Sequence, residues 1–128
     1  RRTTAIFLAD ALMEEIKSKR WDEVTTTNST CSNATAPASL GPDTAEAMIG
    51  YNDIDYFNGL SGTITDSQGV SKSTDYPGFT QQASIIYVNS ASLDTDALAR
   101  TCYKRIEVRI IDATNNETTR LVSLMTSY

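Results

Sequence analysis

Histidine is absent from this 128-residue sequence. Because histidine is the usual general base near neutral pH and the most common zinc ligand, its absence excludes Ser-His-Asp, Cys-His and histidine-metal sites. Basic residues are also scarce, since eleven lysines and arginines face sixteen acidic residues for a net charge of −5. This charge is opposite to that expected of a protein that neutralises phosphates. We therefore expect no nucleic-acid partner.

Long apolar segments are missing too. No stretch of about eighteen apolar residues occurs, so the sequence predicts no transmembrane helix. The chain begins with two arginines rather than methionine, and we expect that a segment upstream was removed by processing or truncation. A length of 128 residues, with 40% hydrophobic and 21% charged residues, suits one ordinary globular core. We therefore predict a single domain over residues 1–128.

Cysteine is rare: the chain has only Cys31 and Cys102, which stand 71 positions apart and form no CxxC motif. In a small domain such a pair either forms a structural disulfide, which implies an oxidising compartment, or remains two unrelated buried thiols. If the disulfide forms, closing so large a loop should stabilise the fold by about 4 kcal/mol on the chain-entropy model.

Residues 1–22 form the expected helical segment, and the strongest periodic signal within it lies in residues 4–21. The residues that follow helical spacing there are apolar: Ala5, Leu8, Ala9, Leu12, Met13 and Ile16. Polar residues share the opposite side: Asp10, Glu14, Lys17 and Ser18. This pattern predicts an amphipathic helix that ends near Trp21. The indole of Trp21 would pack the end of the helix against the core. Around Ile6 and Phe7 the apolar surface widens beyond one stripe.

Residues 23–78 predict a loop-rich region between helix and sheet. Residues 25–50 are dominated by threonine, serine, alanine and asparagine, so we expect a surface loop with a short helical turn at 43–48. A loop of this length is uncommon in a compact domain unless it is functional or pinned, which favours the disulfide. Further along, residues 62–65 predict a short edge strand, and turns are expected at 66–69 and 76–78.

Residues 79–128 change to the period of two that is typical of strands, at 79–88, 104–111 and 118–125. In the second segment Ile106, Val108 and Ile110 share one face, while charged residues occupy the other. The asparagines within 112–117 tolerate positive φ and predict a hairpin turn, whereas 92–99 predicts a connecting loop with a helical turn. The expected fold is α+β, with an N-terminal amphipathic helix packed on an antiparallel sheet of three to four strands.

Asp53 and Asp55, with Asn52 and Asn58 nearby, form the densest cluster of oxygen donors. Two carboxylates in a glycine-ended loop suggest a calcium site, although Phe57 occupies the third donor position of the EF-hand pattern. The alternative is a loop in which these acids cap backbone amides. With calcium or a carbohydrate in this loop, the chain would be a secreted binding module. Paired carboxylates also act as acid and base in glycoside cleavage. A domain of this size has too little structure to form a cleft around them, and we expect no enzymatic activity.

Several segments of the sequence, taken in their order along the chain, resemble those of a known protein family. Residues 11–23 read ALMEEIKSKRWDE, residues 51–60 read YNDIDYFNGL and residues 77–80 read PGFT, before the final strand pair. This order is similar to that of minor pilins of bacterial type IV pili, most closely the MshD family of MSHA biogenesis proteins. The resemblance covers nearly the whole chain and implies a pilin-like α+β fold.

The resemblance also implies a structural role, as a minor pilin or pseudopilin in the assembly, initiation or tip of a pilus or related fibre. It implies a cleaved leader, an N-methylated first residue and an apolar helix half that anchors the subunit in the inner membrane before assembly. The domain would face the periplasm or cell exterior, where Cys31 and Cys102 can pair. Its partners would be other pilin subunits, contacted through the outer helix face with Asp10, Glu14 and Lys17.

Overall fold

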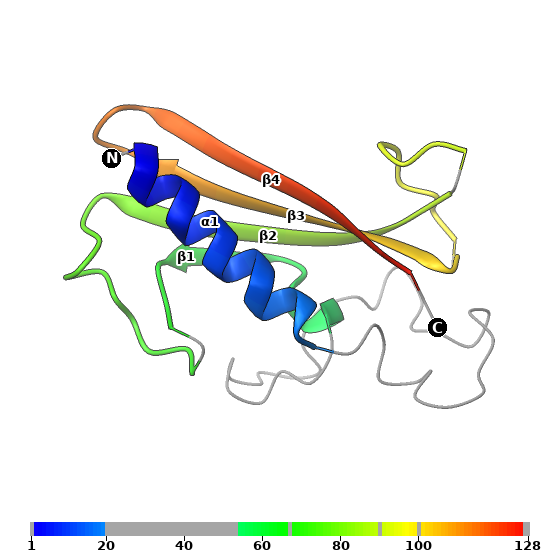
Figure 1. The fold of residues 1–128 in the computed structure, drawn as a ribbon, viewed down its shortest axis with the longest axis horizontal. Coiled ribbons are helices and arrows are strands. Elements are labelled where there is room, and N and C mark those ends of the chain that lie inside the picture. Colours follow the sequence, from blue (N-terminus) through cyan, green and yellow to red (C-terminus); the bar gives the residue numbers. More distant parts are fainter. Residues whose placement is uncertain (1, 20–53, 67, 90, 100, 127–128) are drawn as a thin grey trace.

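The structure is a computed structural model that describes residues 2–19, 54–66, 68–89, 91–99 and 101–126. Within these ranges, one N-terminal helix lies on a four-stranded antiparallel sheet (Figure 1). This confirms the predicted α+β arrangement. The predictions for Cys31, Asp53, Trp21 and the loop at residues 25–50 concern parts of the chain outside the described residues.

Helix α1 spans Arg2–Lys17, and all six residues of the predicted apolar stripe are buried. The helix ends before the predicted position near Trp21. The backbone amides of Ser18 and Lys19 bond to carbonyls three residues back, at Glu15 (3.2 Å) and Ile16 (3.0 Å), which tightens and closes the last turn. The Ser18 hydroxyl also donates to the Glu15 carbonyl at 2.5 Å. Among the described residues, no helix has both the length and the apolar character needed to cross a membrane.

The sheet is a simple antiparallel meander in the order β1-β2-β3-β4. Its strands are β1 (Leu60–Thr63), β2 (Phe79–Val88), β3 (Tyr103–Asp112) and β4 (Glu117–Thr126). The three predicted long strands are confirmed. The short edge strand is confirmed as well, although it begins two residues earlier than predicted.

The turn between β3 and β4 forms as predicted. Asn116 has a φ of 54°, the left-handed conformation that asparagine tolerates. Asp112 closes the turn, because its Oδ1 accepts bonds from the backbone amides of Thr114 (3.0 Å) and Asn115 (3.3 Å).

The connection before β3 differs from the prediction, because residues 91–99 contain turns and no helix. The amide of Ala97 donates to the Tyr87 carbonyl at 2.8 Å, and the amide of Leu98 donates to Asp96 Oδ1 at 2.8 Å. Leu98 has a φ of 59°. The Asp96 carboxylate and the Tyr87 carbonyl thus accept hydrogen bonds from amides that a helix would pair internally. The segment therefore forms a turn rather than a helix.

The core lies between α1 and one face of the sheet. Ile106, Val108 and Ile110 point inward from β3, as predicted, and are fully buried. Burying each such side chain stabilises the fold by roughly 1.5–3 kcal/mol. The 3-10 helix Ile54–Phe57 closes one end of this layer with Ile54 and Phe57. The opposite sheet face, called the solvent face below, carries the alternate side chains of β2, β3 and β4.

Candidate functional site

The outer face of α1 carries the predicted contact residues. Asp10, Glu14 and Lys17 are all exposed and lie three or four positions apart, on the side of the helix away from the sheet. Their exposure confirms the orientation expected from the sequence. Their role in binding another subunit stays a prediction.

The same face is apolar nearer the start of the helix. Ile6 is 52% exposed and Phe7 is 59% exposed, although both are large hydrophobic residues. Adjacent exposed apolar side chains on one surface are a feature of contact sites. We use the name outer face of α1 for the five residues Ile6, Phe7, Asp10, Glu14 and Lys17.

Glu15 lies at the flank of α1, beside a cleft of about 230 Å³ between the helix and residues 64–66. Burial raises the pKa of the Glu15 carboxyl, and the negative charge of Asp66 raises it further, while Lys19 acts in the opposite direction. The ionised carboxylate is therefore disfavoured at this junction of helix and loop.

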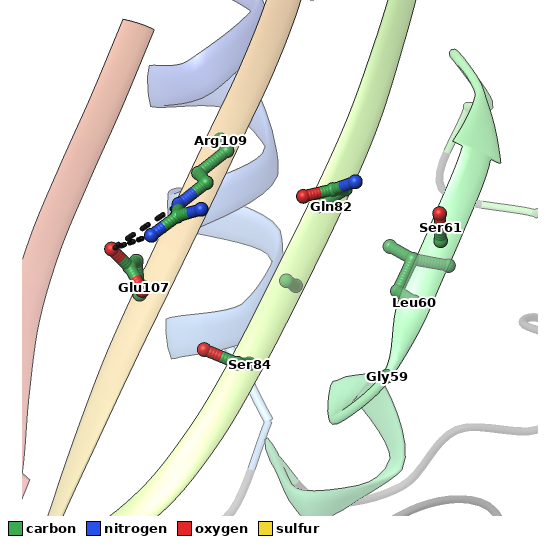
Figure 2. A pocket seen from close by; sticks show the side chains of 8 residues that line it. Gly59, Leu60, Ser61, Gln82, Ser84, Glu107 and Arg109 are labelled. Carbon is green, nitrogen blue, oxygen red and sulfur yellow. Dashed lines mark hydrogen bonds and ion pairs between the residues drawn. The ribbon is translucent and has the colours of Figure 1, made fainter. Parts of the chain in front are cut away.

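The solvent face holds a shallow groove of about 360 Å³ over β1, β2 and β3. Figure 2 shows polar side chains from neighbouring strands around it, with Gln82 and Ser84 on β2 and Glu107 and Arg109 on β3. Glu107 is the one acidic residue among the described residues that line the groove. The described residues that line the groove therefore include no carboxylate pair of the kind that glycoside cleavage requires.

Glu107 lies at the centre of a charged cluster on the solvent face. Its Oε1 accepts a bond from Arg109 Nη2 at 3.2 Å and another from Arg120 Nε on β4. The Arg105 guanidinium approaches within 4.0 Å. Burial alone would raise the pKa of Glu107, but the bonds and charges of Arg120 and Arg109 together outweigh it and hold the pKa below its ordinary value. The carboxylate is thus kept ionised. This suits a structural role in linking β3 and β4 better than a role in proton transfer.

Asp55 lies in a buried ion pair. Its side chain is 2% exposed, and its Oδ1 lies 2.6 Å from the Nζ of Lys104, which is completely buried. The Lys104 ammonium also lies 5.2 Å from the centre of the Tyr87 ring. The Lys104 ammonium therefore neutralises the Asp55 carboxylate, and a calcium role for Asp53 and Asp55 stays a prediction. Asp53 lies outside the described residues, and the part of the chain that is described holds no group of three or more metal-ligating side chains.

Cys102 lies directly before β3. No cysteine among the described residues is a free thiol. Because Cys31 lies outside the described residues, its pairing with Cys102 stays a prediction.

The buried lysine and the Glu107 cluster were not expected from the sequence, although a signal for each was present. Lys104 has the same strand parity as Ile106, Val108 and Ile110, so alternation alone directs it inward. The predicted hairpin turn places Arg109 opposite Arg120, as observed, with Glu107 on the same face.

The chain matches no protein-family model, and comparisons with curated proteins and with solved structures find no match either. The resemblance to minor pilins therefore rests on the order of the sequence motifs.

Proposed function

We propose that this protein is a minor pilin or pseudopilin, a structural subunit that contributes to the assembly, initiation or tip of a type IV pilus or related fibre. The observation that carries the proposal is the outer face of α1. One side of the helix is fixed on the sheet by six buried residues, while the other side exposes Ile6 and Phe7 and then Asp10, Glu14 and Lys17.

The two parts of this face would act differently in a fibre. Burial of Ile6 and Phe7 against neighbouring subunits would remove apolar surface from water and stabilise association. The charged part would contribute mainly to partner choice and register, because exposed charges across an interface affect specificity more than affinity. No active site is needed for this role.

The proposed location is the periplasmic or extracellular side of the bacterial inner membrane before assembly, and the fibre afterwards. Membrane anchoring would come from an apolar segment upstream of this sequence. An oxidising compartment of this kind would permit the predicted Cys31–Cys102 disulfide.

The proposal predicts that charge reversal on the outer face of α1 impairs assembly without unfolding the domain. Glu14→Lys and Lys17→Glu should each lower the amount of this subunit in sheared fibres, because they change the charge presented to neighbouring subunits. The measurement is an immunoblot of the fibre fraction from the natural host carrying the full-length variant, with a thermal melt of the purified domain alongside.

Asp75→Lys is a matched control, because Asp75 is exposed in the turn before β2 and far in sequence from α1. It should leave incorporation unchanged. Wild-type incorporation of both helix variants would overturn the proposed role of this face.

A further inference from the structure

β4 forms one edge of the sheet, as the strand order shows (Figure 1). It pairs with β3 along its whole length in an unbroken register. An edge strand directs alternate backbone N–H and C=O groups outward, where they can pair with a further strand. In the residues that the structure describes, no strand occupies this outer side of β4.

The two edges of the sheet differ in how well they are protected. Proteins usually guard an edge with a short strand, a proline, a lysine or a bulge. At the opposite edge, β1 spans only four residues. β4 spans ten residues and contains no proline, glycine or lysine. Charged side chains also protect edges, but those of β4, Glu117 and Arg120, lie in its first four residues, so residues 121–126 form a regular edge without such protection.

Apolar side chains flank the open edge on both faces. On the solvent face, Val122 is 46% exposed and Leu124 is 38% exposed. On the helix face, Leu121 and Met125 are partly buried at the border of the core. A further strand would thus gain backbone hydrogen bonds and apolar contacts together.

We propose that β4 is a docking edge for a second copy of this chain, and that two chains pair antiparallel through β4 into one continuous sheet. Such pairing requires a two-fold axis perpendicular to the sheet, so that both helices lie on the same side. Directly opposed residues of antiparallel strands share a face, and therefore one residue of β4 lies opposite its own counterpart.

The side chains of β4 fit a register centred on Ser123. Val122 then lies opposite Leu124 of the second copy on the solvent face, and Leu121 lies opposite Met125 on the helix face. Apolar cross-strand pairs of this kind stabilise a sheet, whereas like charges placed opposite each other destabilise it. A register centred on Arg120 would oppose two arginines, while the Ser123 register places Arg120 opposite Thr126. Because β4 is complementary to a second β4 in this register, a second copy of the chain is the partner we propose for this edge. This argument is independent of the proposed fibre role.

Sedimentation equilibrium of the purified protein over a range of concentrations tests the pairing. The wild type should show a monomer–dimer equilibrium, and Val122→Lys should raise the dimer dissociation constant at least tenfold by adding a charge to the edge. Thr118→Lys is the matched control, because it adds the same charge to the same face of β4 outside residues 120–126. A wild type that stays monomeric, or a dimer that Val122→Lys leaves unchanged, would overturn the proposal.

Cysteine cross-linking tests the register. In Ser123→Cys the two introduced residues would lie about 4.5–5.5 Å apart between Cα atoms, within the range of a disulfide. In Thr119→Cys they would be about 26 Å apart, because eight residues of extended strand separate them. Covalent dimers of the first variant but not the second, on non-reducing gels, are expected. Equal cross-linking of both variants, or of neither, would rule out this register.

Discussion

The Lys104–Asp55 pair shows how one residue can tie two separate parts of the chain together. Lys104 belongs to β3 and Asp55 to the 3-10 helix Ile54–Phe57, and their contact at 2.6 Å is buried from solvent. Moving two charges out of water is costly, and their attraction offsets this cost only when the pair is complete. The pair therefore makes the position of the 3-10 helix depend on β3.

Replacing Lys104 alone should be strongly destabilising. Lys104→Met leaves the buried Asp55 carboxylate without its ammonium, and we expect a loss of about 3–5 kcal/mol in the free energy of unfolding. Adding Asp55→Asn to this variant should restore part of the loss, because the buried charge is then removed. Urea denaturation of the single and double variants measures both effects. Lys72→Met is the control, since Lys72 is partly exposed and lies 3.9 Å from Asp66; an equal loss in this variant would contradict the special role of Lys104.

At the scale of elements, the junction between α1 and the loop after β1 carries an electrostatic cost. The folded state raises the pKa of Glu15 through burial, with a further contribution from Asp66. Below the pKa of the unfolded chain, Glu15 is neutral in both states and the cost is absent. As the pH rises through the folded-state pKa, the carboxylate ionises in a site that disfavours it, so the cost is fully present above that pKa.

Glu15→Gln should therefore stabilise the protein at pH 7 and have little effect near pH 4. Because the side chain is partly exposed and its charge is screened, the gain should be roughly 0.5 kcal/mol or less. Thermal melts of wild type and variant across this pH range measure it. Glu14→Gln removes a charge from the exposed side of the same helix and serves as the control. A Glu15→Gln variant that is less stable than wild type at pH 7 would show that the attraction to Lys19 dominates instead.

The elements were predictable where side-chain periodicity is strong. The stripe from Ala5 to Ile16 and the alternation in β3 each define one buried face, so local sequence was sufficient. The helix ends earlier than its periodicity predicts, because the hydrogen bonds that close it at Ser18 and Lys19 have no distinct sequence signal. The contact between Asp55 and Lys104 was not predictable from local sequence, because the two residues are 49 positions apart. Pairing over such a distance depends on how the elements pack, which local patterns do not encode.

At the scale of the whole molecule, the predicted disulfide would link the loop-rich region to the middle of the sheet. Cys102 directly precedes β3, which is paired on both sides by β2 and β4. A bond from Cys31 to this point would close a chain loop that includes the 3-10 helix, β1 and β2. Closing so large a loop restricts the unfolded chain far more than the folded one.

Reduction should therefore destabilise the whole domain rather than one segment. We expect the free energy of unfolding to fall by about 4 kcal/mol, a large share of the roughly 5–15 kcal/mol typical of a domain. Urea denaturation with and without dithiothreitol measures the loss, and alkylation in denaturant counts the thiols before and after reduction. The double variant Cys31→Ser/Cys102→Ser should match the reduced wild type and show no further response to dithiothreitol. Two alkylated thiols in the unreduced protein would refute the pairing, and with it the argument for an oxidising compartment.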